Sequence, residues 1–420
     1  MDDHPQLPVM SRRQALKWVG GAGAAGLVWS RGRALGQNAA GAIEAAEAIA
    51  QRPVADVQDS ASRIRITGVR ATPVGRTLFV KIETNHKLTG WGETYGLPSV
   101  MAALAKELAS LLIDENPTRI EHLWQKMYRA HRGLRDGPLM VNTISAIDMA
   151  LWDITGKLWG VPVFRLLGGP CRDRIRGYHS EKSWKAPPGG IYEHSADPQD
   201  IERMVKMVRD AREKVGPDGT VMFDAHCDMP PAVVIQFAAA IKPYDVLFIE
   251  EPAVHGNIEV FKRIRESVSV PLATGENVRT IFGFIPYLQE RCIDVLQPDC
   301  GQCGGISQMR KIATLAEAYY VPLAPHCTMS FLGMTASLHC AASTPLFLIH
   351  ETYPHIGEKF GGLARKRWEM DRKTGYVSLP EGPGLGVEID EKVLAELAAK
   401  PPSKFKWLNA RYKDGSIADQ

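Results

Sequence analysis

The sequence is poor in the features that mark several large classes of protein. It has only 7 cysteines in 420 residues, widely spaced and odd in number, so a fold held together by disulfides is excluded. No charge of one sign dominates: 50 Lys and Arg face 47 Asp and Glu, the basic residues are dispersed, and nucleic acid is not an expected partner. With 45% hydrophobic and 23% charged residues, the chain is not disordered, collagen-like or a coiled coil. A large core, divided between two domains, must stabilise it.

The N-terminal residues have the pattern of an export signal. Residues 11–17 read SRRQALK, with the pair Arg12 and Arg13, and an apolar Gly/Ala-rich run follows up to Trp29. This pattern resembles a twin-arginine signal peptide, which we expect to occupy residues 1–42 and to direct the protein to the periplasm. The apolar run is too short to span a membrane, and its four glycines disfavour an ordinary amphipathic helix. We therefore expect no stable membrane span after the signal is cleaved.

A small α+β domain is predicted after a polar linker at residues 43–60. Strand-like alternation comes first and helical periodicity follows, which is typical of that class, and we expect the domain to cover residues 61–173. The expected elements are strands at 63–66 and 78–83, a turn out of the sheet at 90–94, and helices at 100–132 and 141–158.

From residue 174 onward, short apolar runs alternate with helical stretches. The runs lie at 175–178, 221–223, 246–249, 271–274, 293–296, 321–324 and 346–349. Repeated βα units predict a parallel sheet with helices outside it, and this many units favour a closed barrel, which we place at residues 174–375. Residues 376–420 remain as a C-terminal segment.

A polar side chain follows six of these apolar runs. The six are Asp224, Glu250, Glu276, Asp299, His326 and Glu351, separated by 26, 26, 23, 27 and 25 residues. A single acidic residue after a strand usually caps the next helix. Six polar groups spaced by one βα unit instead predict a shared site, because the carboxyl ends of barrel strands meet at one mouth.

Three of these carboxylates, Asp224, Glu250 and Glu276, follow adjacent strands and offer only oxygen donors. This donor set suits a hard divalent cation, and Mg²⁺ is the natural candidate. The pair Cys300 and Cys303 has the C-x₂-C spacing of a zinc site but lacks a second pair. We interpret it as two incidental thiols or one small disulfide formed after export.

Five short motifs together resemble the enolase superfamily, in its mandelate racemase and muconate lactonizing enzyme branch. They are MALWDITGK at 149–157, LLGG at 166–169, FIEEP at 248–252, GEN at 275–277 and QPD at 297–299. The resemblance implies a modified (β/α)₇β barrel with an N-terminal α+β capping domain, to which the C-terminal segment returns. It also implies Mg²⁺ that stabilises an enediolate, formed when a base removes the proton next to a carboxylate.

The acid and base residues narrow the resemblance to one subgroup. His226 stands two residues after Asp224, so both side chains are expected on one side of an extended backbone. This arrangement resembles the galactonate dehydratase type of acid-sugar dehydratase, in which the corresponding histidine is the general acid. Asp299 and His326 match the family's Asp-His dyad, which implies that His326 is the base. Glu351 matches the carboxylate that binds the substrate's carboxyl group or the intermediate.

One stretch departs from the family pattern. Members that use a Lys-x-Lys pair carry it on the second barrel strand, and no such strand is visible between Tyr178 and Phe223. The second repeat is therefore expected to be compressed or irregular, which disfavours a lysine base. Lys182, Lys185 and His194 in this stretch are interpreted as solvated loop residues or, alternatively, as relocated contacts to the substrate.

These patterns predict a small-molecule enzyme. We expect Mg²⁺-dependent dehydration of a sugar acid, an aldonate or aldarate, to a 2-keto-3-deoxy acid through an enediolate. One alternative is a racemase or epimerase of a 2-hydroxy acid at the same metal site. An alternative of another class is a non-catalytic periplasmic protein that binds sugar acids. A homo-oligomer is the expected assembly.

Overall fold

A three-stranded antiparallel sheet opens the described part of the chain. The computed structural model describes residues 63–178, 198–227, 229–371 and 373–400. The sheet has the order β1 (Ile66–Val74), β2 (Thr77–Thr84), β3 (Thr89–Tyr95). The turn predicted at 90–94 is wrong, because these residues lie within β3. The glycines that suggested a turn instead allow a close approach: a Cβ at Gly92 would lie 1.9 Å from the carbonyl oxygen of Ala146.

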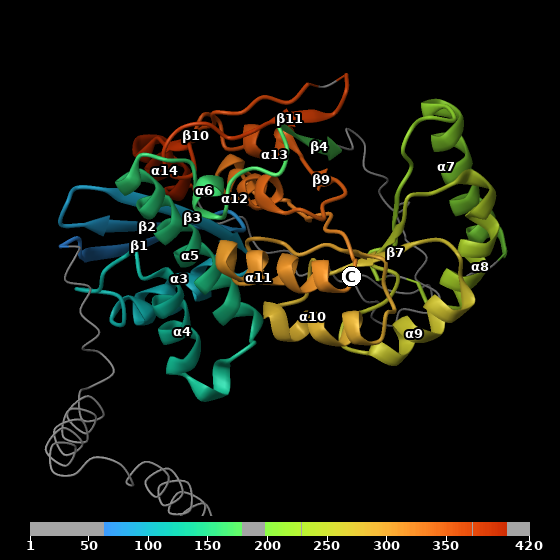
Figure 1. Cartoon of the computed structure of the whole chain (residues 1–420), viewed down its shortest axis with the longest axis horizontal. Coiled ribbons are helices and arrows are strands. Elements are labelled where there is room, and N and C mark those ends of the chain that lie inside the picture. Colours follow the sequence, from blue (N-terminus) through green and yellow to red (C-terminus); the bar gives the residue numbers. More distant parts are fainter. Residues whose placement is uncertain (1–62, 179–197, 228, 372, 401–420) are drawn as a thin grey trace, which may run out of the picture. The chain divides into compact units, whose positions relative to one another are not determined.

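Helices follow this sheet along the chain and complete the capping domain (Figure 1). They are α3 (Pro98–Ala109), α4 (Ile120–Ala130), the short 3₁₀ helix η2 (Arg132–Leu134), α5 (Pro138–Trp159) and α6 (Val163–Leu166). The single helix predicted at 100–132 is wrong. It is interrupted after α3, where Asp114 has a left-handed φ of 64° and Pro117 cannot continue a helix. The prediction for α5 is confirmed: Ile144, Ile147 and Asp148 are fully buried, and the helix packs against β3.

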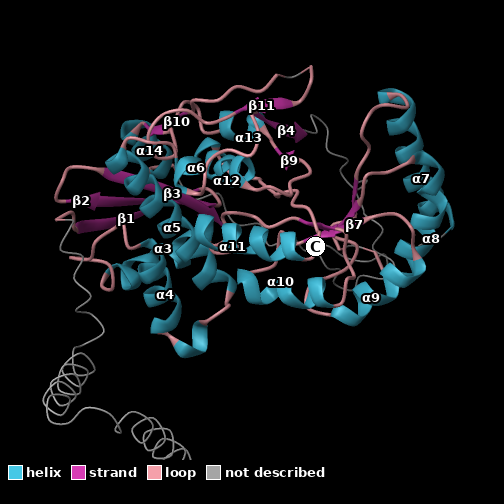
Figure 2. Cartoon of the chain, in the orientation of Figure 1, coloured by secondary structure: helices cyan, strands magenta, loops and turns pink. Residues whose placement is uncertain are grey.

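The second part of the chain is a parallel barrel with helices outside it. Its strands are short, as Figure 2 shows, and loops connect them to the helices. The described strands are β4 (Arg174–Tyr178), β5 (Phe223–Asp224), β6 (Ile249–Glu250), β7 (Leu272–Thr274), β8 (Val295–Leu296) and β9 (His350–Glu351). The helices are α7 (Pro198–Val215), α8 (Pro231–Ile241), α9 (Ile258–Ser267), α10 (Thr280–Gln289), α11 (Gly305–Ala318), α12 (Phe331–Ser343) and α13 (Pro354–Glu358), with the 3₁₀ helix η3 (Lys242–Tyr244).

Strand pairing runs without a break from β5 to β4. β5, β6, β7 and β8 pair in parallel in this order, and single parallel bridges continue from Leu296 to Leu323 and from Leu323 to Phe347. β9 then pairs in parallel with β4. The stretch in which the second repeat was expected to be irregular includes residues 179–197, which lie outside the described residues.

Side chains from consecutive strands fill the interior of the barrel. Five of them form one buried apolar cluster: Phe248, Ala273, Val295, Ala324 and Ile349. Inward-pointing side chains from the strands fill the centre of a barrel of this size. The predicted fold class, an α/β barrel with an N-terminal α+β capping domain, is confirmed.

The end of the chain returns to the capping domain. After β10 (Ala364–Arg365), β11 (Tyr376–Ser378) pairs with β4, and β12 (Glu388–Ile389) pairs with β10. Helix α14 (Glu391–Ala398) then packs against β1. The carboxylate of Glu391 lies 2.6 Å from the Lys81 ammonium group on β2.

Three buried carboxylates join the capping domain to the rest of the molecule. Glu93 on β3 accepts the backbone N–H groups of Ser330 at 2.7 Å and of Gly333 at 3.0 Å, at the start of α12. In the same way, Asp148 accepts the Ser307 N–H at 3.0 Å in the first turn of α11. Asp153 accepts the N–H groups of Trp91 and of Leu385 in the C-terminal segment. The N-terminus of a helix carries partial positive charge, which attracts a carboxylate. The bonds of Glu93 to α12 and of Asp148 to α11 therefore hold the capping domain in place against the barrel helices.

In the described ranges, no helix is long and apolar enough to cross a membrane.

Candidate active site

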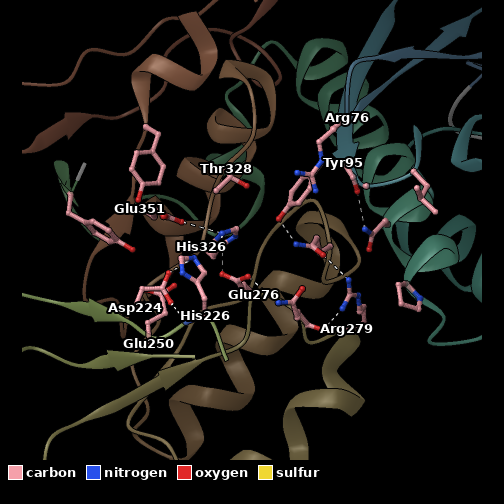
Figure 3. Close-up of a pocket in the computed structure, with 18 of the residues that line it drawn as sticks. Arg76, Tyr95, Asp224, His226, Glu250, Glu276, Arg279, His326, Thr328 and Glu351 are labelled. Atoms are coloured by element: carbon pink, nitrogen blue, oxygen red, sulfur yellow. Dashed lines mark hydrogen bonds and ion pairs between the residues drawn. The ribbon is translucent and has the colours of Figure 1, made fainter. Parts of the chain in front are cut away.

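A cavity of about 900 Å³ lies where the capping domain meets the barrel (Figure 3). Five of the six predicted polar residues, together with His226, line it: Asp224, His226, Glu250, Glu276, His326 and Glu351. The sixth, Asp299, is fully buried and contacts His326. The structure thus brings all of the predicted site residues together at the carboxyl ends of the barrel strands.

The three candidate metal ligands come from adjacent strands. Asp224 ends β5 and stands beside Glu250 at the end of β6, and Glu276 follows β7 by two residues. Burial raises the pKa of Glu250, and the charges of Asp224, Glu351 and Glu276 raise it further. Burial likewise raises the pKa of Glu276 to about 7. Buried carboxylates that repel one another are stabilised by a divalent cation.

The donor set fits Mg²⁺, because it offers oxygen ligands only. As the side chains lie, however, no group of three Asp, Glu, His or Cys residues in the described ranges converges closely enough to hold a metal ion. Asp224 is in contact with His226, whose Nε2 lies 2.7 Å from Oδ2 of Asp224. The His226 side chain is 57% exposed.

The backbone at His226 differs from the expected extended strand. His226 and Cys227 have φ values of 46° and 59°, so the chain turns directly after β5. The backbone N–H of His226 donates to Oδ1 of Asp224 at 2.9 Å, as in an Asx turn. The turn, rather than the two-residue period of a strand, brings the two side chains together.

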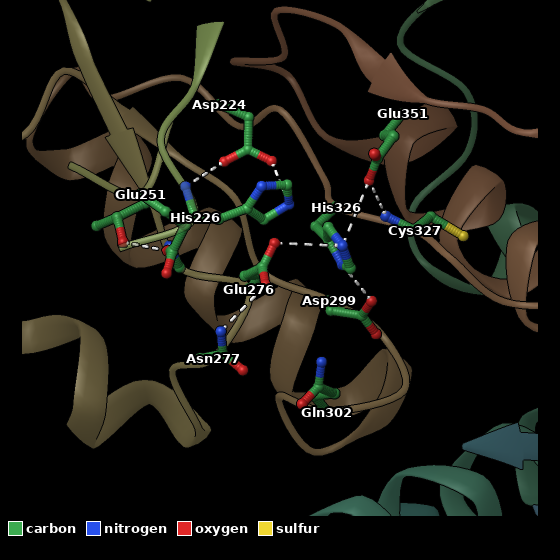
Figure 4. Close-up of polar contacts among 12 residues, drawn as sticks. Asp224, His226, Glu251, Glu276, Asn277, Asp299, Gln302, His326, Cys327 and Glu351 are labelled. Atoms are coloured by element: carbon green, nitrogen blue, oxygen red, sulfur yellow. Dashed lines mark hydrogen bonds and ion pairs between the residues drawn. The ribbon is translucent and has the colours of Figure 1, made fainter. Parts of the chain in front are cut away.

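His326 is held as a base would be (Figure 4). Its Nδ1 lies 2.6 Å from Oδ2 of Asp299, so in the neutral ring the Nδ1–H group donates to that carboxylate and Nε2 carries the free lone pair of a base. Nε2 lies 3.3 Å from Glu276 and 3.6 Å from Glu351. Burial lowers the pKa of His326, but the charges of Glu276 and Glu351 and the bond to Asp299 outweigh it and raise the pKa.

The two carboxylates beside His326 are themselves fixed by hydrogen bonds. Asp299 accepts the Gly301 N–H at 2.7 Å on Oδ1 and the Tyr95 hydroxyl at 3.2 Å on Oδ2. Glu351 accepts the Cys327 N–H at 2.7 Å. Because Tyr95 ends β3, the capping domain contributes directly to the arrangement of the dyad.

The sequence did not single out several residues that line the cavity. They include Arg76, Tyr95, Asn142, Tyr178, Arg279, Gln302, Thr328 and Tyr353. Some had a signal in their position: Tyr178 ends a barrel strand, Arg279 stands three residues after Glu276, and Tyr353 stands two after Glu351. Tyr95 had none, because the site lies about 200 residues further along the chain.

The cysteines near the cavity have structural surroundings. Cys300 and Cys303 are buried free thiols. Of the two alternatives, incidental thiols and a small disulfide, the structure therefore shows incidental thiols. Cys327 is also buried, and Cys227 donates to Glu251 behind the cavity. Lys182, Lys185 and His194 lie outside the described residues.

The comparisons with known proteins agree with this geometry. The family described as mandelate racemase / muconate lactonizing enzyme, N-terminal domain, matches residues 54–168. The one described as enolase C-terminal domain-like matches residues 172–393.

Curated relatives align with this chain over almost their whole length. D-galactonate dehydratases of Ralstonia pickettii (strain 12J) and Xanthomonas oryzae pv. oryzae (strain PXO99A) are each 34% identical over 389 residues, covering 84% of this chain and 99% of the relative. Among solved structures, a mandelate racemase/muconate lactonizing enzyme-like protein from Rubrobacter xylanophilus DSM 9941 superposes with a TM-score of 0.72 at 30% identity, covering 80% of this chain and 98% of that one.

The 3,6-anhydro-D-galactonate cycloisomerase from Zobellia galactanivorans gives a TM-score of 0.71 at 27% identity, covering 79% of this chain and 99% of that one. Fold, site and sequence thus lead to the same family. The chain belongs to the mandelate racemase and muconate lactonizing enzyme branch of the enolase superfamily.

Proposed function

We propose that the protein is a hydro-lyase that dehydrates a sugar acid to a 2-keto-3-deoxy acid. The observation that carries the proposal is the pair of histidines in one cavity. His326 is oriented by Asp299, and His226 lies beside the first candidate metal ligand, Asp224. The similarity to D-galactonate dehydratases supports acid-sugar dehydration as the general chemistry.

Asp224, Glu250 and Glu276 would hold Mg²⁺. When bound, the cation would supply positive charge that makes the proton on C2, next to the carboxylate of the substrate, more acidic. The sequence motifs and the oxygen-only donor set both support this choice of metal, and members of the superfamily generally use it.

The other side chains of the cavity act as base, acid and substrate ligand. Nε2 of His326 removes the C2 proton, and Asp299 stabilises the imidazolium that forms. His226, in its protonated form, donates a proton to the C3 hydroxyl, which leaves as water. Glu351 accepts a hydrogen bond from the substrate on the same side as His326. The enol that results tautomerises to the 2-keto acid, so the net change is the loss of one water molecule.

Racemisation of a 2-hydroxy acid is a second candidate, because two histidines at one cavity could also act as bases on opposite faces of C2. The two reactions differ in whether water is lost. A screen of sugar acids with Mg²⁺ and detection of 2-keto acids identifies dehydration. Entry of solvent deuterium at C2 without loss of water identifies racemisation, and a protein that binds sugar acids without turnover gives neither signal.

Two variants test the proposed roles. His326→Asn should abolish both dehydration and the exchange of the C2 hydrogen with solvent deuterium, because the base acts first. His226→Asn should block dehydration while C2 exchange continues, because the acid acts second. A loss of about two to four orders of magnitude in turnover is expected for each. C2 exchange that persists in His326→Asn would show that another group is the base.

We also propose that residues 1–42 are a twin-arginine signal and that the mature protein is periplasmic. The support is the arginine pair followed by a short apolar run.

A further inference from the structure

The cavity contains a cation that lacks an anionic partner. Arg279 lies in the loop between β7 and α10 and lines the cavity. Its Nη2 donates to Oε1 of Gln302 at 2.7 Å, and its Nη1 donates to the carbonyl oxygen of Asn277. Its Nε is buried and has no hydrogen-bond partner. Within the described residues, no carboxylate forms an ion pair with it.

The buried Arg279 guanidinium is energetically unfavourable unless its Nε–H group finds an acceptor and its charge finds a counter-ion. A buried donor without an acceptor costs about 1 to 3 kcal/mol, and a guanidinium removed from water costs more when no counter-ion replaces the water. Both of its existing acceptors are neutral amide oxygens, and the carboxylates of Asp299 and Glu276 act on its charge only from a distance, without an ion pair. An anion bound in the cavity would supply the missing acceptor and the missing charge.

The cavity is also polarised from one side to the other. Figure 3 shows Asp224 and Glu250 on one side, and Arg76 and Arg279 on the other, with His326 between them. Arg76 comes from the turn between β1 and β2 and lines the same cavity. A substrate whose reacting carboxylate is bound near Asp224 and Glu250 and whose C2 lies at His326 has its remote end directed toward the two arginines.

On this basis, and resting on the proposed function, we propose that the substrate is a dianionic sugar acid whose second anionic group is bound at its remote end by Arg279, with Arg76 nearby. An aldarate, with a carboxylate at each end, has this chemistry, as does an aldonate phosphorylated at its terminal carbon. A simple aldonate such as galactonate ends in a neutral hydroxymethyl group, which cannot compensate the guanidinium. The volume of about 900 Å³ accommodates a six-carbon acid.

The test compares matched substrates in the Mg²⁺-loaded enzyme. Each hexarate is paired with the hexonate of the same stereochemistry and with the corresponding 6-phosphohexonate, and kcat/KM is measured from the 2-keto acid formed. The wild type should favour one of the two dianionic sets over its monoanionic partner, and the preferred set identifies a carboxylate or a phosphate as the remote group.

Substitutions then assign the preference to Arg279. Arg279→Met should lower kcat/KM for the preferred dianion by about 10- to 100-fold more than for the matched hexonate, the size expected for a charge-assisted bond. Arg279→Lys should recover part of the loss. Arg263→Met removes the same charge from an exposed position on α9 and should leave the ratio unchanged.

Two results would overturn the inference while leaving dehydration intact. One is a wild type that prefers hexonates. The other is an Arg279→Met variant that loses activity equally on both classes, which would mean that the arginine only positions Gln302.

A binding measurement keeps the inference separate from the proposed function. In the Mg²⁺-loaded His326→Asn variant, calorimetry should show tighter binding of the dianion than of the hexonate, and adding Arg279→Met should remove the difference. If no sugar acid is dehydrated by the wild type, the proposed function fails. The dianion preference is then still decided by this titration, and equal affinities would refute it.

Discussion

A buried histidine that does not line the cavity gives a quantitative prediction of stability against pH. His339 on α12 is fully buried. Its Nδ1 accepts the Phe164 N–H at 3.2 Å, and its Nε2 lies 3.2 Å from the carbonyl oxygen of Leu385. These partners require a proton on Nε2 and none on Nδ1, so the folded protein holds the neutral ring. Burial accordingly lowers the pKa of His339 from 6.5 to about 4.

The sign of the effect follows from which state takes up the proton first. As the pH falls below 6.5, His339 becomes protonated in the unfolded chain but not in the folded protein. Proton binding therefore stabilises the unfolded state relative to the folded one. The stabilisation from His339 is therefore complete above pH 6.5 and is lost progressively as the pH falls to about 4. At 1.36 kcal/mol per pKa unit, the full loss is about 3 kcal/mol, and about 2 kcal/mol of it falls between pH 7 and pH 5.

The assay must isolate His339, because other buried groups act with the opposite sign. Burial raises the pKa of Glu93 and of Asp148 to about 7, so these carboxyl groups stabilise the folded protein as the pH falls from 7 toward 4.5. Urea unfolding of the wild type and of His339→Gln at pH 7 and pH 5 cancels their contribution. The free-energy difference between the two proteins should shrink by about 2 kcal/mol at pH 5. A difference that stays constant with pH would refute the reasoning.

Three other predictions concern the metal, the packing of the capping sheet and export. Glu250→Gln should abolish Mg²⁺-dependent turnover with an unchanged circular dichroism spectrum, and turnover that survives chelation would exclude the metal assignment. Gly92→Ala should destabilise the protein by about 3 kcal/mol in thermal unfolding, because the added Cβ meets the backbone of α5. Gly133→Ala, with nothing within 4 Å, is the matched control. Replacing Arg12 and Arg13 by Lys should retain the full-length chain in the cytoplasm, and mature protein in the periplasm of that double variant would disprove the export proposal.

The barrel could be predicted from sequence because its signal is periodic. Each βα unit repeats an apolar run, a polar residue at its end and a helix, so the spacing from Asp224 to Glu351 located the strand ends without knowledge of their pairing. The same spacing placed the candidate site residues at one mouth. Local signals sufficed there because the topology of a barrel is itself a repeat.

The capping domain was harder to predict because long-range packing overrides local signals. Gly90 and Gly92 have the composition of a turn, yet they lie in a strand whose neighbour is a helix 50 to 60 residues away in sequence. His226 was placed correctly beside Asp224, but for the wrong backbone reason, since its left-handed φ is not legible from the sequence. Tyr95 reaches the cavity only through tertiary contacts.

The packing of residues 384–398 against the capping domain determines when folding can finish. Lys81 and Glu391 are paired across 310 residues, and the buried Asp153 accepts its bond from the Leu385 N–H near the end of the chain. The capping domain emerges first from the ribosome, but its sheet cannot complete its packing until residues 384–398 have been made. Contacts of such sequence separation form late and slowly. A chain cut before residue 384 would therefore lose more than α14, because Asp153 would keep a buried charge with one donor fewer. The loss would appear as instability of the capping domain.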